Sequence, residues 1–166
     1  MYLNELFFGA YAVGVGMWAL LALCCGKEFL ITLMSLEWVL ANLFVTKQIP
    51  LVGLEATASD ALAIGAALCL NLVQEYYGRS EARKAIWIGF GSILFFIFSS
   101  IMHLLLVPSS FDIHQVHFVA LLSPMPRLML ASLVTYLITQ FIESRLYSFL
   151  NQKLNNKYFI IRNYSS

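Results

Sequence analysis

The feature that most limits how this chain can fold is an uninterrupted apolar run near its start. Residues 6–26 carry no charge and lie between Glu5 and Lys27. Because a helix rises 1.5 Å per residue, about 20 such residues cross the ~30 Å hydrocarbon core of a membrane. A secretory signal peptide would need a positively charged start, but the only charge before the run is Glu5. The run therefore predicts a retained transmembrane helix.

The composition extends this conclusion to the whole chain. Hydrophobic residues make up 60% of the 166 residues and charged residues 11%, whereas charged residues make up about 25% of a typical soluble domain. The mean hydropathy is +0.78. So few charges cannot cover a soluble globule of this size, which excludes a cytosolic enzyme and an acidic disordered tail. With a net charge of +1, the chain also lacks the basic face of a nucleic-acid binder.

Further apolar runs predict an all-α polytopic membrane bundle of about five transmembrane helices, forming a single integral membrane domain over residues 1–166. Gly78 is expected to cap the third span. The apolar stretch 118–122 is too short to cross, so we predict a re-entrant or interfacial segment near 112–125. The runs after the first cover residues 29–46, 56–76, 85–107 and 127–150.

Small residues and cysteines within the runs are expected to serve packing. Spacings of four residues between small side chains let two helix backbones approach closely. The first run has two such pairs, Ala10 with Gly14 and Ala12 with Gly16. The cysteines lack the spacing of metal ligands, and they are Cys24, Cys25 and Cys69.

The distribution of Lys and Arg predicts the orientation, because cytoplasmic loops carry an excess of both. With five spans, one side holds only Lys47 and Arg127. We therefore expect the N-terminus outside, and the basic 79–84 loop and the C-terminal tail in the cytoplasm. The cations on that cytoplasmic side are Lys27, Arg79, Arg83, Lys84, Arg145, Lys153, Lys157 and Arg162.

Polar side chains inside the runs follow helical periodicity. An ionisable side chain within a span costs ~2.5–3.5 kcal/mol on insertion scales and usually faces a cavity or a partner. Glu37 points about 140° away from Asn42 at 100° per residue. One stripe belongs to each of three runs: Ser35, Trp38, Asn42 and Thr46; Asp60, Asn71, Gln74 and Glu75; and Ser132, Thr135, Tyr136, Thr139, Gln140 and Glu143.

Each stripe admits a structural interpretation beside a functional one. Hydroxyls such as those of Thr135 and Thr139 can bond to their own helix backbone, which favours a packing role. Glu75 has Arg79 nearby and can form a structural ion pair with it. Asp60 lies near the outer end of its span, where water can solvate its carboxylate. Amides and a guanidinium at membrane depth need many partners. We therefore predict functional roles for Asn42, Gln74, Arg127 and Gln140.

Three stripes on three helices predict a bundle around a polar site. Amides read donor and acceptor edges, a carboxylate accepts from an amino-pyrimidine edge, and an aromatic ring stacks on a flat ligand. The site suits an uncharged or weakly charged polar solute. The predicted substrate-binding residues are Asn42, Gln74, Glu75, Arg127, Tyr136, Gln140 and Trp38, with Asp60 and Glu143 as coupling candidates.

Signals for catalysis are weak. The sequence contains no HExxH, GxSxG or P-loop motif, so we expect no enzyme, no cofactor and no metal. His103 lies deep in the fourth run, where we expect a buried imidazole with its hydrogen bonds satisfied. A metal site on the outer side formed by Asp112, His114 and His117 is a weaker alternative.

Two stretches carry a more specific pattern. The first is ANLFVTKQIPLVGL (41–54), continuing through CLNLVQEYYGRSEARKAIWIGF (69–90); the second is SPMPRLMLASLVTYLITQFIESRLY (123–147), followed by IRNYSS (161–166). Together they resemble the queuosine precursor transporter family, also called the vitamin uptake transporter family. The resemblance covers residues 39–166. The family pattern falls on Asn42, Lys47, Glu75, Gly78, Arg83, Arg127, Ser132, Tyr136, Gln140, Arg162 and Asn163.

The resemblance implies an inner-membrane carrier that imports a 7-deazaguanine, namely queuine, preQ1 or preQ0, for tRNA modification. Its expected partners are this small molecule and the lipid bilayer, and no nucleic acid is expected. The sequence does not decide whether the protein forms a homo-oligomer. The sequence departs from the family in two ways. Asn71 stands where the family usually has Asp, and the family pattern continues beyond residue 166 with about two more helices, which we expect this chain to lack.

Two other functions remain open from the sequence. The first is the substrate-binding membrane subunit of a vitamin uptake system driven by a separate ATPase, which is less favoured than the carrier. A membrane enzyme or an assembly factor is a further, weaker alternative.

Overall fold

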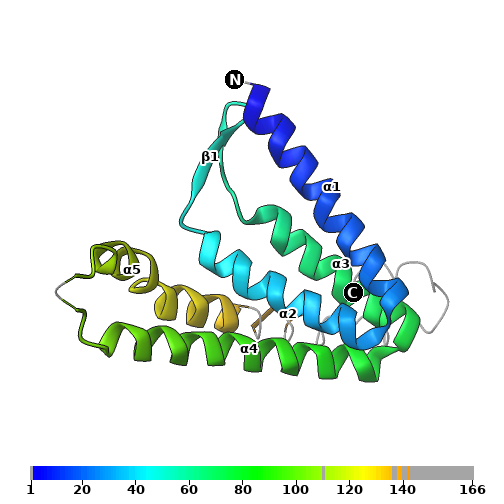
Figure 1. The fold of residues 1–166 in the computed structure, drawn as a ribbon. Coiled ribbons are helices and arrows are strands. Elements are labelled where there is room, and N and C mark those ends of the chain that lie inside the picture. Colours follow the sequence, from blue (N-terminus) through cyan, green and yellow to red (C-terminus); the bar gives the residue numbers. More distant parts are fainter. Residues whose placement is uncertain (1, 110, 136–137, 140–141, 143–166) are drawn as a thin grey trace. The chain divides into compact units, whose positions relative to one another are not determined.

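The computed structural model describes residues 2–109, 111–135, 138, 139 and 142. The chain divides into two units, Met1–Pro126 and Arg127–Ser166, and the first contains every labelled element. In chain order these are α1 (Tyr2–Cys25), α2 (Lys27–Phe44), β1 (Gln48–Leu51), β2 (Leu54–Thr57), α3 (Asp60–Tyr77), α4 (Arg79–Leu105) and α5 (Gln115–Leu122) (Figure 1). The predicted helical bundle is confirmed.

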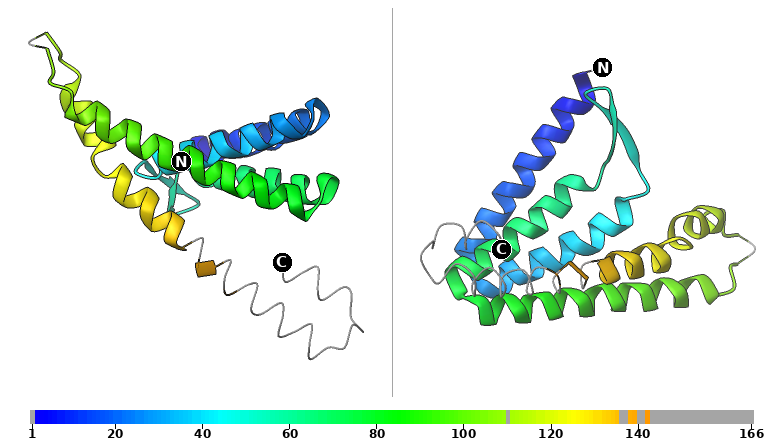
Figure 2. Two further views of the ribbon diagram at one scale, coloured as in Figure 1. Left: turned by 90° about the horizontal axis from the view of Figure 1, so that it is seen from below. Right: turned by 180° about the vertical axis from the view of Figure 1, so that it is seen from behind.

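Four helices of the first unit meet at one end. α2 packs against α1, α3 and α4, and α3 packs against α1 and α4. Single glycines separate two of the helix pairs: Gly26 lies between α1 and α2, and Gly78 lies between α3 and α4. Gly78 caps α3 as predicted, since its N–H donates to the carbonyl of Gln74 at 3.1 Å. From this end α1 and α2 splay apart, and the β-hairpin bridges their other ends (Figures 1 and 2).

Small side chains form much of the contact between α1 and α3. α1 buries Val15, Ala19 and Ala22, which lie on one face at helical spacing. Among the described residues, a β-carbon added at Gly14 or Gly16 would meet nothing within 4 Å, so no described helix approaches α1 closely at those two glycines. α1 is approached closely by α3, at Gly65 beside Val15. The buried residues of α3 are Ala61, Leu62, Gly65, Ala66, Cys69 and Val73.

Three helical stretches among the described residues are long and apolar enough to cross a membrane: Leu3–Cys25, Arg79–Leu105 and Gln115–Thr135. The third joins α5 to the residues after it. The short apolar stretch 118–122, predicted to be re-entrant or interfacial, therefore belongs to a longer helical stretch. α2 and α3 have 18 residues each, a length of about 27 Å. The number of five spans stays a prediction.

A two-stranded antiparallel hairpin lies between α2 and α3, where the apolar runs predict the start of a helix at residue 56 and no strands. Gln48 pairs with Thr57, and Leu51 pairs with Leu54. The two turn residues, Val52 and Gly53, have φ values of 52° and 79°, as a type I′ turn requires. The predicted third run begins at residue 56, whereas α3 begins at Asp60, because the first residues of that run complete β2.

The hairpin is tied to the start of α1 by two hydrogen bonds. Asn4 Nδ2 donates to the carbonyl of Pro50 at 3.2 Å. The N–H of Val52 donates to Glu5 Oε1, also at 3.2 Å. Polar side chains of α1 that precede the apolar run therefore hold the hairpin at the wide end of the unit.

Candidate functional site

Glu37 is the one charged side chain that is buried among the residues the structure describes, with 3% of its surface exposed. It lies on α2, three residues after the buried Met34 and seven after the buried Leu30, a spacing that places all three on one helix face. Its Oε2 accepts a hydrogen bond from Cys69 Sγ at 3.6 Å. α2 and α3 thus enclose a carboxylate in mainly apolar surroundings.

Gly65 makes room for this carboxylate. A β-carbon at residue 65 would lie 3.0 Å from Glu37 Oε1 and 2.2 Å from Val15 Cγ1. Both distances are shorter than an ordinary contact of about 3.5–4.0 Å. Glycine at this position therefore lets α1, α2 and α3 close around the carboxylate.

Glu37 also lines a hollow of about 610 Å³. α1 contributes Tyr11, Val15 and Trp18 to its wall, and α3 contributes Leu62. Small-molecule sites usually have 300–1,000 Å³, mostly apolar walls and a few polar groups that orient the ligand. The hollow fits that description, with the carboxylate of Glu37 as a buried polar group and aromatic rings beside it.

A second hollow of about 500 Å³ lies nearer the hairpin. Its wall is aromatic and carries one cation, Lys47. Tyr11 lines both hollows, so they are neighbours along α1. The second hollow is also lined by Asn4, Phe7, Phe8, Phe44, Ile49 and Ala58.

The predicted binding residues of α2 have neighbours within the bundle. A β-carbon at Gly89 of α4 would lie 2.5 Å from Trp38 Cε3, and the rings of Trp38 and Phe90 are 6.2 Å apart. The indole thus packs α2 against α4. Asn42 Nδ2 donates to the carbonyl of Trp38 at 2.9 Å. Substrate binding by these two residues stays a prediction.

The polar stripe on α3 lies on the opposite side of that helix from the buried carboxylate. Cys69, the hydrogen-bond partner of Glu37, is about 180° around the helix from Asp60 at 100° per residue. Asp60 accepts a hydrogen bond from the Thr57 hydroxyl. The structure therefore does not bring the stripe to Glu37, and all its members are exposed: Asp60, Asn71, Gln74 and Glu75.

The stripe of the fifth run is described only in part. Arg127 is exposed. The Thr139 hydroxyl donates to the carbonyl of Thr135 at 2.9 Å, which confirms that a hydroxyl of this stripe bonds to its own helix. The remaining predicted residues, Tyr136, Gln140 and Glu143, lie outside the described residues.

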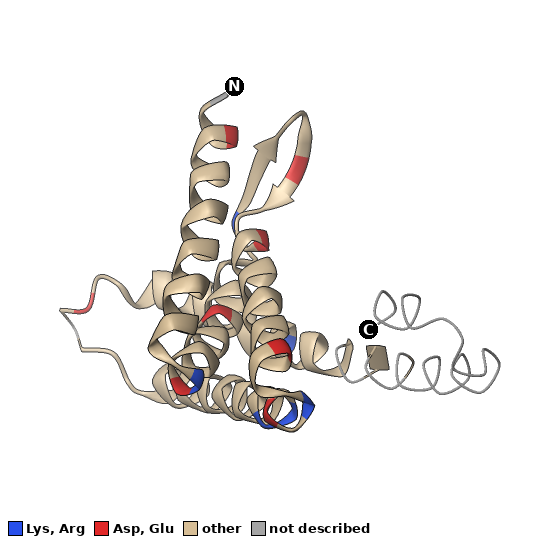
Figure 3. Cartoon of the chain, turned by 90° about the vertical axis from the view of Figure 1, so that its right-hand side faces the viewer, with Lys and Arg blue, Asp and Glu red and all other residues tan. Residues whose placement is uncertain are grey.

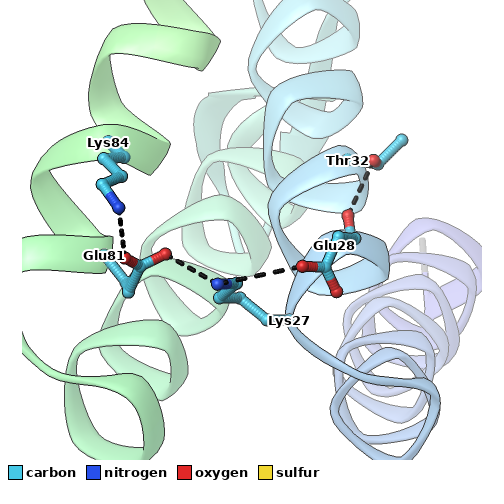
Figure 4. A network of polar contacts seen from close by, with 5 residues as sticks. All are labelled: Lys27, Glu28, Thr32, Glu81 and Lys84. Carbon is cyan, nitrogen blue, oxygen red and sulfur yellow. Dashed lines mark hydrogen bonds and ion pairs between the residues drawn. The ribbon is translucent and has the colours of Figure 1, made fainter.

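A charged network joins α2 to α4 at the end where four helices meet. Lys27 Nζ lies 2.9 Å from Glu81 Oε2 and 3.8 Å from Glu28 Oε1 (Figure 4). Lys84 Nζ lies 2.6 Å from Glu81 Oε1. The hydrogen bond with Glu81 raises the pKa of Lys27. Figure 3 shows basic residues gathered at this end, away from the N-terminus.

The histidines do not form a recognisable site. His103 is exposed, so the prediction of a buried imidazole is wrong; its ring lies 5.0 Å from that of Phe118. The Asp112 carboxylate accepts from the N–H of His114 at 2.8 Å. Among the described residues, no group of three or more His, Cys, Asp or Glu side chains is placed to hold a metal ion.

Glu37 is the residue whose importance the sequence analysis missed. The periodicity separates it from Asn42 but says nothing about what it faces. A usable signal was present, because a carboxylate in the middle of an apolar run is costly unless it finds a partner or a cavity.

The sequence model of the family described as "putative vitamin uptake transporter" matches residues 57–166. The chain belongs to this family. It is also similar to a protein of Bacillus subtilis (strain 168) named "Probable queuosine precursor transporter", with 34% identity over 123 residues. That match covers 74% of this chain and 54% of the relative, so the chain spans about half the length of the relative. No solved structure matches significantly.

Family membership confirms the resemblance noted in the sequence. Together with the three apolar helical stretches, it indicates a multi-pass membrane protein.

Proposed function

We propose that this protein is a membrane carrier that imports a queuosine precursor, a 7-deazaguanine such as queuine, preQ1 or preQ0. The observation that carries the proposal is the 34% identity to a relative named as a queuosine precursor transporter. The chemistry agrees with it. A flat bicyclic ring with amide and amine groups suits a mainly apolar hollow with aromatic walls and a buried carboxylate.

The proposed mechanism is alternating access around a polar site near the middle of the membrane. Asp60 and Glu143 are proposed as coupling residues. The described wall of the hollow beside Glu37 includes none of the predicted binding residues. These residues are proposed to contact the substrate at other points along its path through the second, third and fifth spans, namely Trp38, Asn42, Gln74, Glu75, Arg127, Tyr136 and Gln140.

The proposed location is the inner membrane, with the N-terminus outside and the 79–84 loop and C-terminal tail in the cytoplasm. The charged end of the first unit supports this orientation. Lys27 and Lys84 meet there around Glu81, beside the start of α4 that carries Arg79 and Arg83. Positive charge of this kind is typical of the cytoplasmic side.

The test is uptake in cells that cannot synthesise queuosine precursors. The full-length protein is expressed, labelled preQ1 or queuine is supplied, and both cell-associated label and the modified base in tRNA are measured. We expect both to rise above an empty-vector control, with the label first recovered as the unchanged compound. The absence of both signals would overturn the proposal.

Two further outcomes separate the alternatives. Loss of uptake when a separate ATPase module is deleted would identify a subunit of an ATPase-driven system. Conversion of the compound by the purified protein would identify an enzyme.

A further inference from the structure

The buried carboxylate of Glu37 can accept more hydrogen bonds than the one that Cys69 donates to it among the described residues. An ionised carboxylate has two oxygens and about four lone-pair sites. Cys69 Sγ donates to Oε2 at 3.6 Å, and a thiol is a weak donor. Oε1 lies beside Gly65, which contributes no side chain. A carboxylate kept in apolar surroundings is costly unless further donors reach it.

The hollow beside Glu37 supplies the place from which such donors would come. Its volume of about 610 Å³ leaves room for a small molecule beside Glu37, which is one of the residues in its wall. The wall carries the rings of Tyr11, Trp18 and Phe29, which suit a flat ligand because aromatic faces stack on planar rings. A flat ligand with a donor edge would satisfy both the carboxylate and the walls.

We propose that Glu37 in this hollow binds the lactam N–H and exocyclic amine of the 7-deazaguanine, with the ring against the aromatic wall. This inference rests on the proposed function and names the site for that substrate. The lactam N–H and the neighbouring amine point the same way, so the two carboxylate oxygens accept two parallel hydrogen bonds. Such paired bonds to a charged acceptor are short and strong.

This arrangement specifies which ring systems bind. Guanine presents the same pair of donors, whereas hypoxanthine lacks the amine and adenine presents a ring acceptor in place of the lactam N–H. A buried site built to hydrogen-bond a group rejects an analogue that lacks it. Guanine should therefore compete with the substrate, and hypoxanthine and adenine should compete poorly.

The test is equilibrium binding of labelled preQ1 to the full-length protein purified in detergent. We expect Glu37→Gln to weaken binding at least about tenfold, because the glutamine side chain offers one acceptor and turns a donor toward the second substrate donor. The matched control is Glu55→Gln on the exposed face of β2, which should bind within about twofold of wild type.

The wild-type protein supplies a second measurement that needs no variant. Guanine should displace labelled preQ1 at a concentration at least about tenfold lower than hypoxanthine or adenine. Equal displacement by all three would overturn the inference even if Glu37→Gln does not fold. A folded Glu37→Gln protein with wild-type affinity would also overturn it, whereas wild-type protein that binds no 7-deazaguanine would overturn the proposed function as well.

Discussion

Gly65 offers the sharpest test of how the helices close around Glu37. In Gly65→Ala, the new β-carbon would lie 2.2 Å from Val15 Cγ1 and 3.0 Å from Glu37 Oε1. The first distance must grow by roughly 1.3 Å or more to reach an ordinary carbon–carbon contact. Val15 is β-branched and has few alternative rotamers. Relief therefore requires α1 or α3 to move.

Overpacking of this kind costs about 1–3 kcal/mol, and alanine recovers roughly 0.5–1 kcal/mol of helix propensity. We therefore expect the free energy of unfolding to fall by at most about 2.5 kcal/mol. The measurement is titration of the full-length protein in mild detergent with a denaturing detergent, followed by circular dichroism. Gly91→Ala on α4 is the control, because its β-carbon would meet nothing within 4 Å.

A second substitution shows whether the cost of Gly65→Ala comes from the contact with Val15 or from other effects of the added methyl group. Val15→Ala removes the γ-carbon that the new methyl group would meet. In the double variant, Gly65→Ala should therefore cost less than it does in the wild-type background. The reasoning is refuted if Gly65→Ala is as stable as Gly91→Ala, or if Val15→Ala leaves its cost unchanged.

Two further substitutions test contacts elsewhere in the first unit. Gly89→Ala would place a β-carbon 2.5 Å from Trp38 Cε3, so we expect a loss of about 1–3 kcal/mol in the same titration; unchanged stability would show that the indole does not pack there. Val52 has a φ of 52°, a conformation that costs roughly 1–2 kcal/mol for most residues and that Asn tolerates better. Val52→Asn should therefore raise the thermal unfolding temperature, and a lower temperature would contradict the turn geometry.

The helices were predictable because their signal is local. A run of apolar residues about 20 long predicts a membrane helix wherever the rest of the chain lies. The cap at Gly78 was equally local. The hairpin was missed because each of its strands has four residues, too few for a clear alternation, and because Pro50 and Gly53 indicate a turn without indicating strands.

The candidate site was predictable only in part. The 100° periodicity placed Asp60, Asn71, Gln74 and Glu75 on one face of α3, and all four lie on one exposed face. The periodicity did not show which face of α3 packs against the other helices. Lipid tails are as apolar as leucine side chains, so polarity alone does not identify the packed face of a membrane helix.

The sequence by itself determined the class of this protein, its apolar helices and the basic residues expected in the cytoplasm, because hydropathy and charge belong to each segment separately. Only the tertiary structure decided that Glu37 is buried. That burial needs Cys69 as a donor, the missing side chain of Gly65 and the packing of Val15 from another helix. These residues are far apart in the chain, and no local pattern records that folding brings them together.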